Sequence, residues 1–509
     1  MTKIKVKVKV KVKVKKQEGM GMEPVLSRDP RTGEVRARVG VEADTAAVDM
    51  AVRAAHATLD ALADRAARSA LLRAAADGVE SRAAELIAAA DAETALGVPR
   101  LTGELARVAY QFRFFADIVD DGAFLGVVID APDASAVPPR PELRRWKVPI
   151  GTVAVFAASN FPFAFSVPGG DTASALAAGC PVVVKAHPDH PQTSELAAAT
   201  IREAAVKVGL PADVLTLIHG YQAGADLVRH PLISAVGFTG SIPGGRALFD
   251  LAAARPSPIP FYGELGSLNP VLITDRAART RPAEIAAGLV ASYTLGQGQF
   301  CTKPGLVLVP AGQAGDALTR SATETAAEAA PGALLDARMR EHFLAGFAAR
   351  AAAPGVRTLA AAAAAPTDAA PQAVRAGLLE VDAADLGPDL LEECFGPVTV
   401  LVRYRDAADA ETVLSRLGGN LTATLHAESG EPDAAAWLTR LSRFAGRVIF
   451  GGWPTGVAVA PAMTHGGPYP ATTTPTTSVG GTAIDRWLRP VTYQTVPEDL
   501  LPPELAKHL

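Results

Sequence analysis

Short runs of β-branched and aromatic residues alternate with longer helical segments through the middle of the chain. The runs fall at 152–156, 182–184, 215–218 and 235–238. Helical signals lie between them, at about 169–178 and from 191 to about 208. Repeated strand–helix units form parallel sheets that are covered by helices. This pattern therefore predicts an α/β fold with a doubly wound nucleotide-binding domain, although no Gly-x-Gly-x-x-Gly fingerprint follows any of the runs.

The rest of the chain also divides into extended and helical segments. The pattern predicts a hairpin at 28–39 and helices over about 45–96, 104–116 and the alanine-rich residues 314–365. In the helix that begins at Pro191, Thr193 or Ser194 is expected to cap the free N–H groups. A chain of 509 residues is long enough for two to four domains.

The N-terminal segment alternates lysine with β-branched residues and carries eight lysines within residues 3–16. It lacks the continuous apolar region of a signal peptide. One interpretation is a tail that binds anionic surfaces. The other, which we favour, is a disordered extension, or translation begun upstream of a start at Met20 or Met22. Residues 1–22 are therefore expected to form a low-complexity tail.

Composition excludes several classes of protein. The chain has only Cys180, Cys301 and Cys394, without paired spacing, which argues against a disulfide framework and a cysteine-based zinc site. We therefore expect no metal and a reducing, cytoplasmic location. A net charge of −4 gives no reason to expect a nucleic-acid partner, and no apolar stretch is long enough to span a bilayer.

Three polar residues stand in apolar or glycine-rich frames that suit covalent catalysis. Cys301 follows the turn-forming residues 296–299 and precedes the apolar run 306–309, so its thiol is presented at a strand end. A cysteine nucleophile needs an electropositive, partly accessible setting. Asn160 follows the first strand and can donate to an oxyanion, and Glu264 lies in an apolar turn where burial would raise a carboxyl pKa, as suits a general base. Taken singly, a core cysteine, a turn-capping Asn and a hydrogen-bonded Glu are the more ordinary interpretations.

A second group of residues suits a nucleotide. Lys185 ends the second run, at the sheet edge where α/β folds bind ligands, and can contact ribose hydroxyls or a phosphate. Gly240, Ser241 and Gly245 open the helix after the fourth run, where backbone N–H groups can approach a pyrophosphate. A solvated lysine and a plain strand-to-helix turn are the alternatives at these positions.

The order of these motifs resembles the aldehyde dehydrogenase superfamily, over about residues 28–497. The motifs are Asn160-Phe-Pro, Lys185, Phe238-Thr-Gly-Ser, Glu264-Leu-Gly, Gly298-Gln-Phe-Cys301 and Glu393-Cys-Phe-Gly-Pro397. Further segments are similar to a bacterial group of this family that oxidises α-ketoglutaric semialdehyde (2,5-dioxopentanoate). They are 159–166, 169–181, 185–188 and 463–470.

The resemblance implies a mechanism and a cofactor. Cys301 attacks the aldehyde carbonyl, Asn160 and the Cys301 N–H hold the oxyanion, hydride passes to a nicotinamide, and Glu264 activates the water that hydrolyses the thioester. Lys185 is implied at the adenosine ribose, Gly240, Ser241 and Gly245 at the pyrophosphate, and Glu393 with Phe395 at the nicotinamide ribose. NAD-preferring relatives have a glutamate where this chain has Pro188, so we expect NADP, or both NADP and NAD, to be accepted, with His187 contributing to a 2′-phosphate site.

The resemblance also implies the domain layout. Residues 23–131 and 150–262 are expected to form the Rossmann-like cofactor domain, 263–465 an α/β catalytic domain, and 132–149 with 466–509 a β-arm for oligomerisation. A two-stranded arm is marginal alone, so a homodimer or homotetramer is expected.

Three alternatives to 2,5-dioxopentanoate oxidation remain at this point. Transfer of the thioester to coenzyme A is disfavoured by Glu264, and a non-catalytic scaffold by the presence of both Cys301 and Glu264. A fatty or aromatic aldehyde is favoured if Phe161, Phe163, Phe165 and Phe300 line an apolar tunnel. A substrate that carries a carboxylate instead needs an arginine there.

Overall fold

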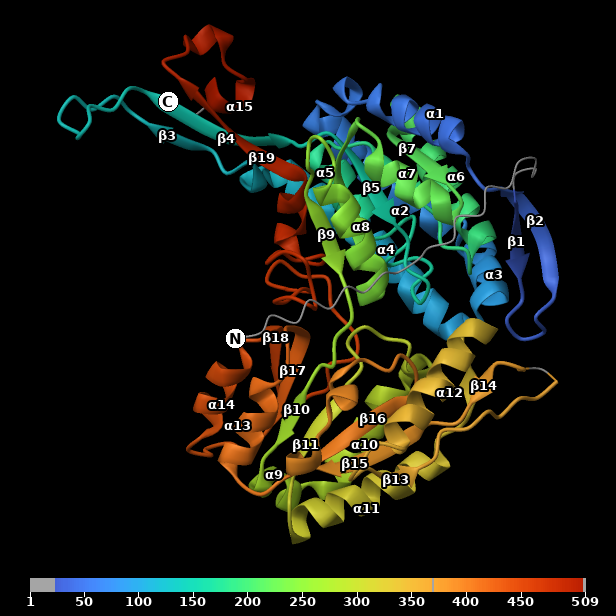
Figure 1. Ribbon diagram of the computed structural model, residues 1–509. Coiled ribbons are helices and arrows are strands. Elements are labelled where there is room, and N and C mark those ends of the chain that lie inside the picture. The colour runs from blue at the N-terminus through green and yellow to red at the C-terminus, as the bar shows by residue number, and fades with distance from the viewer. Residues whose placement is uncertain (1–22, 369, 507–509) are drawn as a thin grey trace, which may run out of the picture.

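Two large sheets and a small projecting arm organise the computed structural model, which describes residues 23–368 and 370–506 (Figure 1). The predicted tail at 1–22 lies outside these residues. The upper lobe of Figure 1 holds the five-stranded sheet, and the lower lobe holds the seven-stranded sheet. The chain crosses between the two lobes after β9.

The five-stranded sheet is parallel throughout and runs in the order β7-β6-β5-β8-β9. Its strands are β5 (Thr152–Phe156), β6 (Val182–Lys185), β7 (Leu215–Ile218), β8 (Ile233–Thr239) and β9 (Phe261–Glu264). The doubly wound prediction is thus confirmed. The strand order reverses direction between β5 and β8, which is the switch point where such sheets bind ligands.

Both faces of this sheet are buried, as the continuous apolar strands require. Successive side chains of a strand point to opposite faces, so Val153 and Val155 pack in one core while Ala154 and Phe156 pack in the other. The first core is covered by α2 (Arg65–Ser81), α3 (Ala83–Thr94), α4 (Val98–Asp121), α5 (Gly170–Ala178) and α6 (Pro191–Lys207). The second is covered by α1 (Thr45–His56), α7 (Tyr221–Arg229) and α8 (Ile242–Ala253).

The N-terminal hairpin pairs β1 (Pro24–Arg28) with β2 (Val35–Val41), as predicted. The predicted cap of α6 is wrong. Thr193 and Ser194 lie inside the first turn, and the carboxylate of Glu93 on α3 accepts hydrogen bonds from the N–H groups of Gln192 and Thr193, both at 2.9 Å. A tertiary contact therefore replaces the local cap.

The seven-stranded sheet runs in the order β13-β15-β16-β11-β10-β17-β18 and is parallel except at β13. Its strands are β10 (Val271–Ile273), β11 (Leu306–Pro310), β13 (Arg357–Ala360), β15 (Gly377–Asp382), β16 (Val398–Tyr404), β17 (Asn420–His426) and β18 (Ala445–Phe450). Its helices are α9 (Asp275–Thr280), α10 (Pro282–Thr294), α11 (Gln313–Glu328), α12 (Ala337–Ala351), α13 (Ala407–Ser415) and α14 (Ala434–Leu441). A short pair, β12 (Gly332–Ala333) with β14 (Ala373–Val374), lies outside this sheet.

The helical prediction for the alanine-rich residues 314–365 is wrong beyond α12. Residues 357–360 form β13, which pairs antiparallel with β15 at the sheet edge, and residues 361–365 form no helix. Alanine favours helix only when packing does not decide otherwise, and here the sheet partner decides.

The arm is a three-stranded antiparallel sheet that projects from the upper lobe (Figure 1). It contains β3 (Val128–Asp130), β4 (Leu143–Pro149) and β19 (Leu488–Gln494), and α15 (Pro503–Ala506) follows it. The arm thus begins earlier than expected. Residues 466–487, also expected in the arm, return instead to the main body, where the Leu265 N–H donates to Ala471 O at 2.7 Å and Trp487 Nε1 donates to Ser174 Oγ at 2.8 Å. Among the helices of the described residues, none is long and apolar enough to cross a membrane.

Candidate active site

Several predicted residues meet at the carboxyl edge of the five-stranded sheet. Lys185 ends β6 and Glu264 ends β9, and the strand register pairs Thr239 with Glu264. The loop that contains Asn160 follows β5, between them. Because parallel strands place their carboxyl ends at one edge, residues far apart in the sequence come together here.

Cys301 comes to this edge from the other lobe, on the loop between α10 and β11. Asn269 holds the backbone of this loop: its Nδ2 donates to Cys301 O at 2.8 Å and to Lys303 O at 2.9 Å. Gly298 packs so closely that a Cβ there would lie 2.2 Å from Gly396 O, and its φ of +65° also favours glycine. The Cys301 side chain is half-buried, on a loop whose backbone is held.

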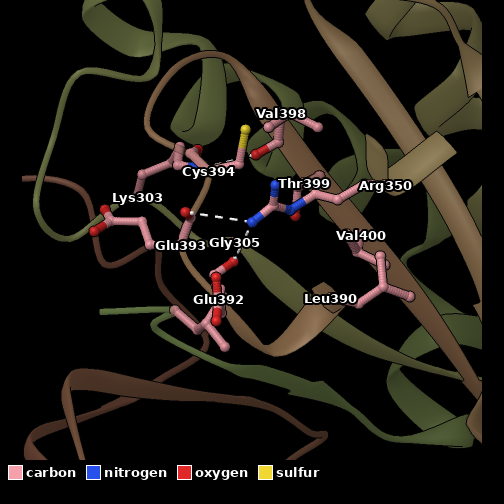
Figure 2. A pocket seen from close by; sticks show the side chains of 11 residues that line it. Lys303, Gly305, Arg350, Leu390, Glu392, Glu393, Cys394, Val398, Thr399 and Val400 are labelled. Carbon is pink, nitrogen blue, oxygen red and sulfur yellow. Dashed lines mark hydrogen bonds between the residues drawn. The ribbon is translucent and has the colours of Figure 1, made fainter. Parts of the chain in front are cut away.

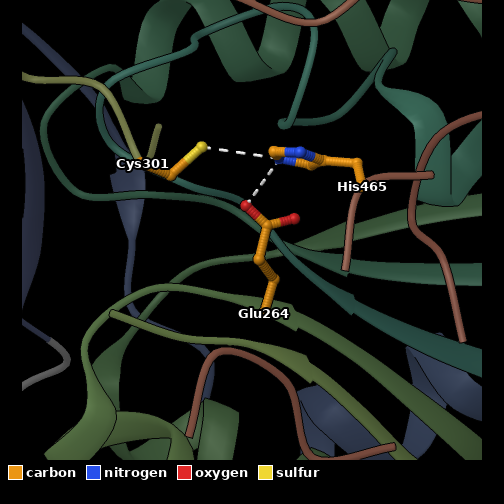
Figure 3. Close-up of side chains that lie close together, drawn as sticks. All are labelled: Glu264, Cys301 and His465. Carbon is orange, nitrogen blue, oxygen red and sulfur yellow. Dashed lines mark hydrogen bonds and ion pairs between the residues drawn. The ribbon is translucent and has the colours of Figure 1, made fainter. Parts of the chain in front are cut away.

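Cys301, His465 and Glu264 form one contiguous group (Figure 3). His465 Nε2 lies 3.5 Å from Cys301 Sγ and 2.9 Å from Glu264 Oε1. Ser478 Oγ donates to Glu264 Oε2 at 2.8 Å, so both carboxylate oxygens have a polar neighbour. His465 and Glu264 are almost fully buried, at 1% and 3% exposure. A thiol thus lies beside two groups that can take its proton.

The electrostatics of this group correct two expectations. Burial raises the pKa of Cys301 well above its usual value, and the neighbouring Glu264 and Glu393 raise it further, so the setting is not electropositive. Burial also raises the pKa of Glu264, but the contacts with His465, Ser478 and Cys301 outweigh burial and leave that pKa below its ordinary value. The expected rise in the carboxyl pKa is therefore wrong. The arrangement is a neutral thiol beside an ionised base.

The same three side chains could hold a metal ion, which the sequence gave no reason to expect. Their ligand atoms all lie within 4.8 Å of one another, and thiolate, imidazole and carboxylate are the ligand types that zinc binds. The ligand set appears only on folding, because its members are far apart in the sequence.

Asn160 lies next to the Cys301 loop. Its side-chain Nδ2 donates to Gln299 O at 2.9 Å, and its backbone carbonyl accepts from Arg100 Nη2 at 2.6 Å. The side chain is buried. An amide has two N–H donors, so one holds the Cys301 loop and the other is left for a further acceptor.

The four phenylalanines that were candidates to line an apolar tunnel lie in two different places. Phe161, Phe165 and Phe300 pack together, with ring centroids 5.3 Å apart for Phe161 and Phe165 and 5.1 Å apart for Phe161 and Phe300. Phe165 also lies 5.7 Å from the His465 ring, so this cluster adjoins the thiol. Phe163 is fully buried in the core beneath the five-stranded sheet and cannot line a tunnel.

Lys185 and His187 share a half-buried site with the carboxyl of Asp189, which the sequence did not single out. Burial lowers the pKa of His187 well below its usual value, so this ring is neutral near pH 7 and offers hydrogen bonding without charge. The Asp189 N–H donates to His187 Nδ1 at 3.2 Å, and Asp189 Oδ2 lies 3.4 Å from the same nitrogen. Burial and nearby Asp336 raise the pKa of Asp189 to about 7.

The glycines at the start of α8 permit close packing, and their N–H groups are bonded within the protein. The Gly240 N–H donates to Glu264 O at 3.0 Å, and the Gly245 N–H donates to Ser241 O at 2.9 Å, so both are engaged. A Cβ at Gly245 would lie 2.1 Å from Leu265 Cδ2, which explains the absence of a side chain there. Ser241 is the N-cap of α8 and accepts from the Gly244 N–H at 3.3 Å. The helix begins at the same edge as Lys185, which fits a pyrophosphate held against a helix N-terminus.

Glu393 lines a small pocket together with Lys303, Arg350 and Cys394 (Figure 2). Arg350 Nη2 donates to Glu392 O at 2.9 Å, and Lys303 Nζ donates to Cys394 O at 3.0 Å, so two cations hold the backbone around Glu393. Burial raises the pKa of Glu393 to about 7. Cys394 packs in the core of the lower lobe, and Phe395 beside it is half-buried.

Sequence reasoning missed His465, Ser478 and Asp189. His465 and Ser478 belong to the segment after β18, whose course back to β9 is not encoded in any local pattern. The signal for His465 was its place in His465-Gly-Gly-Pro, where adjacent glycines permit close packing: a Cβ at Gly466 would lie 2.3 Å from Thr476 O.

Comparison with known proteins shows the family of the chain. The model of the "Aldehyde dehydrogenase family" matches residues 17–467. The chain is 48% identical to Alpha-ketoglutaric semialdehyde dehydrogenase 2 of Azospirillum brasilense, over 94% of this chain and 93% of that protein. It is 43% identical to Alpha-ketoglutaric semialdehyde dehydrogenase of Acinetobacter baylyi, over 83% of this chain and 81% of that protein.

A solved structure has the same fold. Aldehyde Dehydrogenase C from Pseudomonas syringae, a mutant in complex with NAD+ and octanal, aligns with a TM-score of 0.78 and 22% identity. The alignment covers 92% of this chain and 93% of that one. The family match, the identity over nearly the whole length and the fold all agree. This chain therefore belongs to the aldehyde dehydrogenase family, whose members oxidise aldehydes with NAD(P).

Proposed function

We propose that this aldehyde dehydrogenase oxidises 2,5-dioxopentanoate to 2-oxoglutarate through a thioester on Cys301. The observation that supports the chemistry is the contact of Cys301 with His465 and Glu264. The observation that supports the substrate is the identity of 48% and 43% to two proteins named for that semialdehyde.

In the first half of the reaction, Cys301 Sγ forms a bond to the aldehyde carbon while its proton passes to Glu264 or His465. The carbonyl oxygen becomes an oxyanion, and the free N–H of Asn160 Nδ2 and the Cys301 N–H donate to it. The bound nicotinamide cofactor supplies the hydride acceptor. The residues that would hold that cofactor are Lys185, His187, Ser241, Glu393 and Phe395. Gly240 and Gly245 would let the start of α8 pack closely against Phe238 and Leu265 beside it. The product of this half-reaction is a thioester on Cys301.

In the second half, Glu264 takes a proton from water, which attacks the thioester carbon and releases the carboxylate. The lowered pKa keeps Glu264 ionised and ready to accept that proton. Ser478 and His465 orient the carboxylate. A buried hydrolytic base of this kind is also the reason to prefer hydrolysis over transfer to coenzyme A.

A panel of aldehydes tests the substrate. We expect kcat/KM for 2,5-dioxopentanoate to exceed that for hexanal by roughly 100-fold or more, because a site that binds a polar group rejects analogues that lack it. Steady-state formation of reduced cofactor measures both. Equal rates for the two aldehydes would instead favour a fatty aldehyde dehydrogenase, for which the cluster of Phe161, Phe165 and Phe300 is the supporting observation.

We further propose that the enzyme accepts both NADP and NAD, with Asp189 setting the balance. Its carboxyl lies in the site of Lys185 and His187, and a charged carboxylate there repels a 2′-phosphate while it can accept hydrogen bonds from ribose hydroxyls. Because its pKa is raised to about 7, the group is neutral below that pH and charged above it.

The ratio of kcat/KM for NADP to that for NAD is therefore expected to fall several-fold as the pH rises from about 6 to about 8. Asp189→Asn should raise the ratio and remove its pH dependence. A strong NAD preference at every pH, unchanged in the variant, would exclude both the NADP proposal and the role of Asp189.

The arm of β3, β4 and β19 supports a proposal that the enzyme is a homodimer or homotetramer, because a small sheet gains stability by pairing with a second subunit. Light scattering of the purified protein measures the assembly, and a monomer would exclude it.

A further inference from the structure

Helix α4 presents three charged side chains to the active-site loop. Arg100, Glu104 and Arg107 are separated by four and three residues, so they lie on one face of the helix. Glu104 Oε1 accepts from the N–H groups of Phe163 and Ala164, both at 2.8 Å, and fixes the helix against the loop after β5. The two arginines flank this anchor.

Arg107 has unused hydrogen-bonding capacity. Its Nη1 and Nη2 are buried and have no hydrogen-bond partner among the described residues, while its Nε donates a long bond of 3.4 Å to Val457 O. Although Glu104 attracts this guanidinium, its two terminal nitrogens without an acceptor are costly, because they have lost their hydrogen bonds to water. Such a group in an active site indicates a partner that arrives with the substrate.

The position of Arg107 is close to the reacting thiol. Its Cζ lies 5.3 Å from the centroid of the Phe165 ring, and that ring lies 5.7 Å from the His465 ring. His465 in turn contacts Cys301. The carboxylates of Glu104 and Glu264 both lie within electrostatic reach of the guanidinium.

The neighbouring Arg447 and Arg100 are engaged fully or in part by backbone carbonyls. Arg447 directs Nη1 to Gly456 O at 2.9 Å and Nη2 to Pro454 O at 2.6 Å, so it holds a loop. Arg100 donates Nη2 to Asn160 O, which leaves it one terminal nitrogen and Nε. Only Arg107, of these three, keeps both terminal nitrogens for a bidentate contact with a carboxylate.

We propose that Arg107 binds the carboxylate of the aldehyde substrate through both terminal nitrogens and so selects aldehydes that carry a carboxylate at the far end of a short chain. The proposal rests on the proposed function, which it deepens by naming the residue that recognises the substrate class. Phe161, Phe165 and Phe300 then contact the methylene groups between the two ends. An n-alkanal fills the apolar part but leaves Arg107 unpaired, which explains how the site rejects it.

The test compares wild type, Arg107→Gln and the control Arg113→Gln at saturating cofactor. Arg113 lies on the same helix but is half-exposed and forms salt bridges to Asp77 and Glu80. The substrates are 2,5-dioxopentanoate, glutarate semialdehyde and pentanal, which share five carbons and differ at the far end. For Arg107→Gln we expect kcat/KM to fall roughly 100-fold for the two carboxylate-bearing aldehydes, mainly through KM, and to change less than about threefold for pentanal. Arg113→Gln should match wild type with all three.

A binding measurement that needs no turnover supplements the kinetics. Glutarate should protect Cys301 of the wild type from alkylation by iodoacetamide, and at least tenfold more glutarate should be needed in Arg107→Gln. An equal fall with pentanal and the carboxylate-bearing aldehydes would show a structural role and overturn the proposal, as would unchanged kinetics or unchanged protection. Wild-type preference for glutarate semialdehyde over 2,5-dioxopentanoate, with kcat/KM for both falling roughly 100-fold in Arg107→Gln, would refute the proposed substrate and leave the role of Arg107 intact. A wild type that favours no carboxylate-bearing aldehyde over pentanal would refute both.

Discussion

Replacement of Cys301 by alanine is expected to abolish aldehyde oxidation, with a loss of roughly 10⁴-fold or more in kcat. The reason is that the variant has no atom that can form the thioester, and neither Asn160 nor Glu264 can substitute for a nucleophile. Cofactor binding should be unchanged, because Lys185 and Glu393 are untouched. Formation of reduced cofactor measures the first effect, and fluorescence titration with NADP or NAD measures the second.

Cys180→Ala is the matched control for this variant. Cys180 is fully buried, and its thiol lies 3.4 Å from Trp487 O in the core of the upper lobe, so its loss should reduce stability slightly and leave turnover intact. Turnover by Cys301→Ala within tenfold of wild type would overturn the covalent mechanism. Turnover lost in both variants would point to general damage to the fold.

The sequence predicted the strands of the upper lobe well because they are short, apolar and bounded by helices. Asn160, Glu264 and Lys185 could be placed at one sheet edge for the same reason, since each follows or ends a strand of that sheet. The roles of these residues remain proposals. What the structure adds is the bond from Asn160 to the loop of Cys301 and the position of His465 between Cys301 and Glu264.

Features that depend on tertiary contacts could not be read from local patterns. The cap of α6 is Glu93, about 100 residues away in the chain, although Thr193 and Ser194 are residue types that cap helices locally. The strand β13 is alanine-rich, yet its pairing with β15 overrides helix propensity. His465 reaches Cys301 only because the segment after β18 returns to β9, and that return reverses the expected direction of the Glu264 pKa shift.

Replacement of Glu264 by glutamine is expected to stop hydrolysis while sparing thioester formation. Glutamine keeps the shape of the side chain and can bond to Ser478, but it cannot accept a proton from water. His465 Nε2, 3.5 Å from the thiol, remains to take the Cys301 proton. Steady-state turnover should therefore fall roughly 100- to 10,000-fold, the usual contribution of a general base.

Rapid mixing distinguishes the two half-reactions of Glu264→Gln. We expect a burst of one reduced cofactor per active site followed by very slow turnover, and an acyl adduct on Cys301 that intact-mass spectrometry detects. In the wild type, the lowered pKa keeps Glu264 ionised at and below neutral pH, so the hydrolysis rate should be flat there and fall only in acid, below the ordinary carboxyl range. A variant with no burst would assign the first deprotonation to Glu264 as well. Normal steady-state turnover would remove Glu264 from the mechanism, and His465 would then be the only remaining base in contact with Cys301 among the residues that the structure describes.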